Sequence, residues 1–293
     1  MTKIIGLSGK KQSGKTTTAN WIIGQQMVNM DMVSWVRIDR LGRLVVPSVV
    51  NDEVVEGIFD PQSHDPNVEM LLAQYIWPVV KLYSFADILK MAAAAIFGLQ
   101  PEQVNGTNAQ KDAPTKYKWS MFKGFLLPKT QKQYAKEIAA NDNMSSRHIL
   151  QVMGTDIFRR IYGNVWVDAC LKNIKDDGPE LAIVTDCRFP NEVEGIQKAG
   201  GKVIRFLRAP FAGQDEHESE TALDNYTGFD HIFDNRELSI AEQNEQTNRL
   251  LTAWKCNTWD WQTQSETQSV TPHPQDRQGY APGFVDTVEN DPR

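Results

Sequence analysis

The chain has 293 residues, 41% of them hydrophobic, and a formal net charge of −6. This length suits one large α/β domain or two small ones with a buried core. The acidic balance argues against direct nucleic-acid binding over a broad face. No apolar run approaches the roughly 20 residues that span a bilayer, so no membrane partner is expected. Three widely spaced cysteines argue against a disulfide framework or a zinc site, and with no signal peptide they favour a cytoplasmic protein.

The first predicted element is a buried strand over residues 3–7, and a helix follows from about residue 15. Between them, Gly9, Gly14, Lys15 and Thr16 satisfy G-x-x-x-x-G-K-[ST], a loop pattern typical of phosphate binding. The glycines permit torsions and a close approach that a Cβ would hinder, so successive N–H groups can surround an anion. Lys15 is expected to reach the β- and γ-phosphates, and Thr16 to offer its hydroxyl to Mg²⁺. The loop therefore predicts binding of a nucleoside triphosphate, most naturally ATP.

The remaining elements alternate along the chain. Further strands are predicted over residues 33–38, 79–85, 181–185 and 202–207, and further helices over residues 86–97, 146–161, 165–174, 191–199 and 239–254. This alternation predicts an α/β fold, a three-layer parallel sheet with helices on both faces. Long connections, at about 40–78 and 107–136, are typical of lids or binding loops. From residue 258 the chain is polar, which predicts a flexible or loosely docked tail.

Two strand ends carry candidate site residues. In a doubly wound sheet, ligands bind beyond the carboxyl ends of the strands. Asp186 is therefore a candidate for Mg²⁺ or its waters, and Arg188 for phosphate, although both suit a surface ion pair as well. Phe85 ends another predicted strand and Lys90 lies in the helix after it, and both would suit a nucleotide acceptor, through base stacking and charge. They are equally compatible with a hydrophobic anchor and a solvated lysine.

An ordered set of motifs carries a family resemblance. The segments KLYSFADILK, GLQPEQVNGTNAQKDAPT, SSRHILQVMGTDIFRRIYGNVWVDA, VTDCRFPNEVEGIQKAGGKVIR and HESE resemble those of the bacteriophage deoxynucleoside monophosphate kinases, over about residues 1–252. The resemblance implies a phosphate-loop nucleoside monophosphate kinase fold with lid and acceptor insertions. It implies transfer of the γ-phosphoryl group of ATP, with Mg²⁺, to a deoxynucleoside monophosphate in the host cytoplasm. It predicts a kinase domain over residues 1–257, with insertions at about 40–78 and 107–163. A tail follows over residues 258–293. A homodimer is compatible with the resemblance.

The resemblance also implies roles for individual residues. Arg147 matches the basic residue for the acceptor phosphate, Trp166 and Asp168 match the acceptor-site aromatic and acid, and Arg188 matches an arginine of the active centre. The predicted catalytic residues are Lys15, Arg147 and Arg188. The predicted ATP-binding residues are Gly9, Lys10, Lys11, Gln12, Ser13, Gly14, Lys15, Thr16 and Thr17, and Thr16 and Asp186 are the predicted metal ligands. The predicted acceptor-binding residues are Lys11, Phe85, Lys90, Arg147, Gly154, Thr155, Trp166, Asp168 and Arg188.

One position departs from the family pattern, and two residues receive no role. Many relatives carry an acid after the loop lysine, where this chain has Thr16, so its loop follows the common kinase pattern instead. His217 and Glu220 of the HESE motif match the family without a firm role. Two other classes stay open from the residues alone: a small-metabolite kinase such as a dephospho-coenzyme A kinase, and a phosphate-loop ATPase or regulator without an acceptor.

Overall fold

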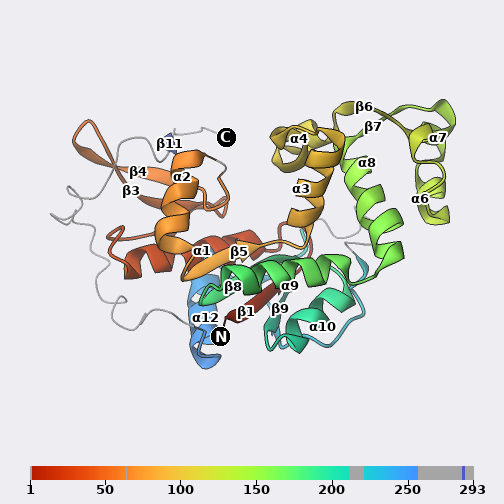
Figure 1. Cartoon of the computed structure of the whole chain (residues 1–293). Helices are drawn as coiled ribbons and strands as arrows, with labels where there is room; N and C mark the ends of the chain where they lie inside the picture. Colours follow the sequence, from red (N-terminus) through yellow and green to blue (C-terminus); the bar gives the residue numbers. More distant parts are fainter. Residues whose placement is uncertain (1, 64, 211–220, 257–285, 288–293) are drawn as a thin grey trace. The chain divides into compact units, whose positions relative to one another are not determined.

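The protein is described here by a computed structural model that covers residues 2–63, 65–210, 221–256 and 286–287 (Figure 1). The chain divides into two compact units. The first comprises Met1–Tyr83 and Ile174–Arg293, and the second comprises Ser84–Asn173.

The first unit is built on a five-stranded parallel sheet, as predicted. Its strand order is β10-β9-β1-β8-β5. The strands are β1 (Lys3–Ser8), β5 (Val80–Tyr83), β8 (Leu181–Cys187), β9 (Lys202–Phe206) and β10 (His231–Phe233). β10 lies in a segment where no strand was predicted. Because all five strands run the same way, their carboxyl ends meet at one edge of the sheet, where a ligand site is expected.

Helices cover both faces of this sheet. Ile5 and Leu7 of β1 are fully buried in a cluster with Ile22 and Ile23 of α1 (Lys15–Asn29). On the opposite face, Gly6 lies against α10 (Pro190–Lys198), where an added Cβ would approach Ile196 to 2.7 Å. The three layers follow from the period of two in a strand, because neighbouring residues of β1 face different helices.

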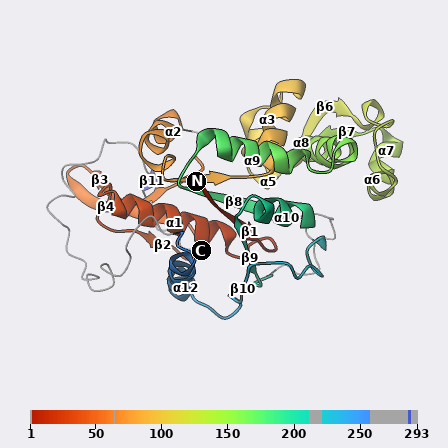
Figure 2. The same ribbon diagram turned by 60° about the horizontal axis from the view of Figure 1, so that its bottom comes forward.

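The helix α12 (Ile240–Ala253) lies against α1 (Figure 2). It begins with a capping box, in which Ser239 and Glu242 exchange hydrogen bonds. One turn before its end, Asn248 accepts a hydrogen bond from the indole of Trp21 at 2.9 Å. α12 is therefore tied to α1 by packing and by this hydrogen bond.

A second, antiparallel sheet occupies the connection before β5. Its strands are β2 (Arg37–Ile38), β3 (Leu44–Val50), β4 (Glu53–Phe59) and β11 (Asp286–Thr287), in the order β11-β4-β3-β2. β3 and β4 form a hairpin whose turn residues Asn51 and Asp52 both have positive φ, as a two-residue primed turn requires. The helix α2 (Pro66–Leu71) and the π-helix η1 (Leu72–Ile76) follow.

The predicted strand over residues 33–38 is wrong, since only its last two residues pair, antiparallel to β3 rather than in the parallel sheet. The apolar character of this run has another cause. Val33 is buried and Val36 packs against the same cluster, but both do so from a loop. Burial of side chains produced the strand-like pattern without a strand.

The second unit is mainly helical, around a core that includes Trp119 and Ile149. Gly98, at a φ of 59°, ends the first helix as predicted. The predicted helix over residues 146–161 is an α-helix that continues as a π-helix. The elements are α3 (Ala86–Phe97), α4 (Pro101–Asn105), α5 (Asn108–Asp112), β6 (Pro114–Lys118), η2 (Trp119–Met121), α6 (Pro128–Gln133), α7 (Ala135–Ala140), β7 (Asn143–Ser145), α8 (Ser146–Gln151) and η3 (Val152–Arg159).

The division between the units falls inside α9 (Val165–Asp177), which matches the predicted helix over residues 165–174. Most of the predicted tail lies outside the described residues, as do His217 and Glu220. Within the tail, Asp286 and Thr287 pair with Ile58 and Gly57 of β4. In the part of the chain that the structure describes, no helix is long and apolar enough to cross a membrane.

Candidate active site

The predicted phosphate loop joins β1 to α1, at the carboxyl edge of the parallel sheet. Gly9 has a φ of 155° and Gly14 a φ of 101°, so both positions use backbone torsions that favour glycine. Gly14 also caps the start of α1, and Lys15 is the first residue of that helix. The loop thus ends at the positive end of a helix of 15 residues, which is the context that the motif requires.

The side chain of Lys15 folds back over the loop. Its Nζ donates to the carbonyl oxygens of Gly9 and Lys10, each at 2.8 Å. These carbonyls hold the ammonium group above the loop. The neighbouring hydroxyl of Thr16 is on an exposed residue, where an incoming ligand can reach it.

Lys10 and Lys11 differ in their surroundings. The Nζ of Lys10 lies 2.6 Å from a carboxylate oxygen of Asp224, which Arg205 approaches to 3.5 Å. Lys11 is exposed, and among the described residues no polar partner is recorded for it. Of the two lysines, Lys11 is the one whose charge is open to a ligand.

Asp186 lies at the end of β8, the strand next to β1. The register pairs Ser8, the last residue of β1, with Cys187, so Asp186 stands beside the start of the phosphate loop. Asp186 and Thr16 offer a carboxylate and a hydroxyl, the hard oxygen ligands that suit Mg²⁺. Across the described residues, no group of three or more His, Cys, Asp and Glu side chains forms a metal cage. The donor set therefore fits an ion that also binds substrate phosphates and waters.

Arg188 is exposed, while its backbone is held from behind. The N–H of Arg188 donates to Oε2 of Glu192 at 2.7 Å, and that of Phe189 donates to the same oxygen at 3.0 Å. Glu192 is only 1% exposed. This buried carboxylate, which the sequence analysis did not single out, fixes the turn from which the Arg188 side chain projects.

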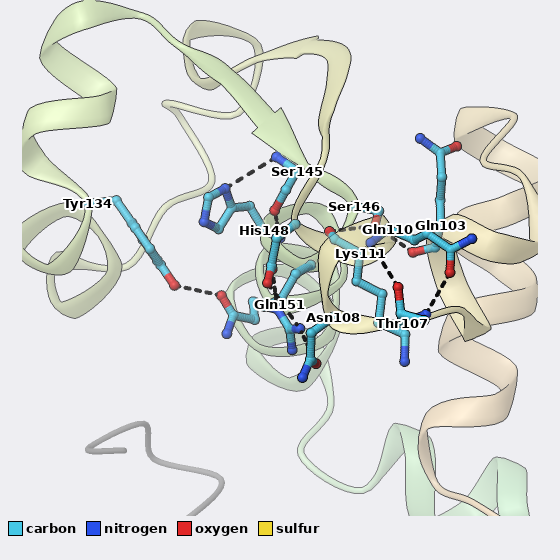
Figure 3. Close-up of polar contacts among 12 residues, drawn as sticks. Gln103, Thr107, Asn108, Gln110, Lys111, Tyr134, Ser145, Ser146, His148 and Gln151 are labelled. Carbon is cyan, nitrogen blue, oxygen red and sulfur yellow. Dashed lines mark hydrogen bonds and ion pairs between the residues drawn. The ribbon is translucent and has the colours of Figure 1, made fainter. Parts of the chain in front are cut away.

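In the second unit, Arg147 stands at the start of α8 and contacts α5. Its Nε donates to Asp112 at 2.6 Å, and its Nη2 donates to Asn108 at 2.9 Å. Ser146, which is fully buried, places its hydroxyl within 2.9 Å of the carbonyl oxygen of Lys111 (Figure 3). These contacts fix α5 beside the first turn of α8.

Lys90, Lys111 and Arg147 form what we name the cationic cluster, from α3, α5 and α8. Burial lowers the pKa of Lys111 below the ordinary lysine value, and the positive charges of Lys90 and Arg147 lower it further. Asp112 opposes this shift. Lys90 and Arg147 therefore each act electrostatically on Lys111, which links the three positive charges through Lys111. Lys111 was not a predicted site residue, because only the packing of α5 against α8 brings it to the other two.

The predicted acceptor residues Phe85 and Trp166 are buried, at 3% and 5% exposure. The indole of Trp166 donates to the carbonyl oxygen of Gly154 at 3.1 Å and meets Phe158 edge to face. Gly154 itself permits close packing, since an added Cβ would lie 2.8 Å from Leu89. In this structure these residues hold the helices together and present almost no surface to a base.

The two remaining predicted acceptor residues differ in exposure. Asp168 is exposed and accepts a hydrogen bond from the hydroxyl of Tyr162. Thr155 is half-buried on η3. Their roles in acceptor binding stay predictions.

Comparison with known proteins decides the family. Residues 81–244 match the family described as deoxynucleotide monophosphate kinase. The chain belongs to this family. This kinase uses ATP and transfers its γ-phosphoryl group to a deoxynucleoside monophosphate. The matched segment contains the cationic cluster as well as Asp186 and Arg188, whereas the phosphate loop precedes it.

Two viral relatives are similar to the kinase over about three quarters of its length, and a third over about a quarter. A protein of Acanthamoeba polyphaga mimivirus, named for the same kinase activity, is 28% identical over 233 residues, 79% of this chain and 88% of its own length. A deoxynucleotide monophosphate kinase of Escherichia phage RB69 is 24% identical over 75% of this chain and 88% of its own length. A deoxynucleoside-5'-monophosphate kinase of Escherichia phage T5 is 28% identical over 88 residues.

Proposed function

We propose that the loop of residues 9–16 binds the triphosphate of ATP and that Lys15 stabilises the charge that develops during transfer. The observation that carries the proposal is the loop itself, with glycine torsions at both ends and Lys15 held over its carbonyls at 2.8 Å. A lysine in this place can exchange the carbonyls for phosphate oxygens at little cost in geometry. Lys11 adds a second, exposed positive charge.

Thr16 and Asp186 would hold Mg²⁺ in the kinase. When bound, the ion would neutralise charge on the phosphates of ATP. Asp186 is suited to this role because the pairing of Ser8 with Cys187 places it beside the loop. Thr16 is suited because its residue is exposed on the first turn of α1.

The acceptor monophosphate would bind at the cationic cluster. Arg147 has a planar guanidinium group, which suits a phosphate dianion, and it shares the electrostatic environment of Lys111, on which Lys90 also acts. Phosphoryl transfer needs alignment and charge neutralisation more than a strong base, since the acceptor is already an anion. Arg188 would contribute a further positive charge beside the γ-phosphoryl group.

The test is an assay that couples ADP formation to an optical signal, with ATP and each of the common deoxynucleoside monophosphates. We expect ADP to form only when an accepted deoxynucleotide is present, in equal amount to the deoxynucleoside diphosphate produced. Equal ADP formation without an acceptor would support an ATPase instead. Turnover with dephospho-coenzyme A but with no deoxynucleotide would support the small-metabolite kinase.

A further inference from the structure

A pair of buried amides lies directly behind the phosphate loop. Asn235, between β10 and α12, is fully buried, and Gln243 of α12 is 2% exposed. Asn235 Nδ2 donates to the carbonyl oxygen of Ser13 at 2.7 Å and to Gln243 Oε1 at 2.8 Å. Gln243 Nε2 donates to Thr18 Oγ1 at 3.0 Å and lies 3.3 Å from the carbonyl oxygen of Gly14. Buried amides with this many partners have a determined orientation.

These two carbonyls belong to the peptide planes that carry the N–H groups of Gly14 and Lys15. In a planar trans peptide, the C=O and the N–H point in opposite directions. When the amides hold the carbonyls of Ser13 and Gly14 on one side, the N–H groups of the next residues are turned to the other side. That side is the concave one, where an anion would bind.

The fit is tight enough to need glycine at position 14. An added Cβ would lie 2.9 Å from Gln243 Nε2 and 3.0 Å from Asn235 Nδ2. Arg208 completes the arrangement, because its N–H donates to Asn235 Oδ1 at 3.0 Å and its Nη2 donates to the carbonyl oxygen of Leu238 at 2.6 Å. The corner between β10 and α12 is thus fixed at both ends.

We propose that Asn235 and Gln243 are positioning residues that aim the loop's N–H groups at the triphosphate without touching the nucleotide. The inference rests on the proposed ATP site in the loop. It assigns a part in phosphate binding to α12, through Gln243, and to the connection before it, through Asn235.

The substitution Asn235→Asp tests this role because it keeps the shape and replaces the donor with an acceptor. The new carboxylate would face the carbonyl oxygen of Ser13, so the peptide planes should rotate. We expect the affinity for Mg-ATP to fall by about ten- to a hundredfold, with a parallel loss in kcat/KM for ATP and little change in KM for the deoxynucleotide. Gln243→Glu should lower the affinity for Mg-ATP by a smaller factor, because Asn235 can still donate to the new carboxylate.

Asn248→Ala is the matched control. It removes a buried amide of the same helix that binds Trp21 of α1 and makes no contact with the loop. It should lower the temperature of unfolding while leaving ATP affinity close to that of the parent chain. If the substitutions act only by destabilising α12, the affinity for ATP should fall in all three variants in proportion to the stability lost. That result would overturn the proposal.

Binding of inorganic tripolyphosphate, measured by calorimetry beside ATP, separates the remaining outcomes. If Asn235 positions the loop, Asn235→Asp should lower the affinity for both ligands by the same factor. A larger loss for ATP would mean that Asn235 acts on the base, and unchanged binding of both would mean that the amides do not aim the loop. If the parent chain binds neither ligand, the proposed ATP site fails, which is a different result.

Discussion

The phosphate loop and the cationic cluster are built in opposite ways. The loop is held from behind by buried amides, and Lys15 already lies over its carbonyls. The cluster lies nearer the surface, where the side chains of Arg147 and Asp112 are 40% and 55% exposed and pair with each other. With the proposed assignment, a triphosphate would meet a prepared site, whereas an acceptor phosphate would have to join or replace a protein carboxylate. This contrast predicts that loop variants lose catalysis and that cluster variants change acceptor affinity.

The largest effect is expected from Lys15→Ala. The substitution removes the cation that Gly9 and Lys10 hold over the loop. The turnover number should fall by about two orders of magnitude or more, because charge that develops in the transition state loses its partner. Initial rates at saturating ATP and deoxynucleotide measure this.

Lys198→Ala serves as the control for that variant. Lys198 is a 78% exposed lysine of the same unit, paired only loosely with Glu194 at 3.7 Å. We expect unchanged turnover there. Lys15→Ala with a turnover number within about threefold of the parent chain would contradict the role of this loop in catalysis.

A smaller effect concerns pH and the cationic cluster. The pKa of Lys111 lies below the ordinary lysine value of 10.5, and only the protonated form attracts a phosphate. As pH rises through this lowered pKa, KM for the deoxynucleotide should increase by about fivefold, the scale of one partly exposed ion pair. Lys111→Arg should flatten this rise because arginine stays charged. Identical alkaline profiles for the parent chain and the variant would exclude Lys111 from the acceptor site.

The smallest effect is expected from Asp112→Asn. This change removes the carboxylate that would compete with the proposed acceptor phosphate for Arg147, at 2.6 Å from its Nε. KM for the deoxynucleotide should fall by about two- to threefold, since an exposed ion pair contributes little free energy. Asp142→Asn makes the same change in net charge at another exposed acid and should have no effect. An increase in KM for Asp112→Asn would show that this carboxylate helps to orient Arg147.

The features that depend on residues close together in the sequence could be predicted from the sequence alone. Gly9, Gly14 and Lys15 are close in sequence, so the loop and its position between β1 and α1 were readable from spacing alone. The prediction of a strand over residues 33–38 was wrong because Val33 and Val36 pack against the core from a loop, which gives the sequence the same apolar pattern as a buried strand.

The rest of the candidate site depends on packing between distant segments. Asn235 reaches Ser13 across 222 residues, and Lys111 meets Arg147 only because Ser146 fixes α5 beside α8. Neither residue stands in a pattern that a single sequence reveals. The burial of Trp166, in contrast, agrees with the usual place of a tryptophan on an amphipathic helix.

Steady-state kinetics of Arg147→Ala, with each substrate varied in turn, test the central claim most directly. The account places ATP at the loop and the acceptor phosphate at the cationic cluster. KM for the deoxynucleotide should rise by about tenfold or more, because the guanidinium group that can form two charged hydrogen bonds to the phosphate is lost. KM for ATP should stay within about twofold. Lys136→Ala, which removes an exposed lysine of α7 in the same unit, should leave both constants unchanged. A raised KM for ATP with an unaltered KM for the deoxynucleotide would contradict the assignment of the acceptor site.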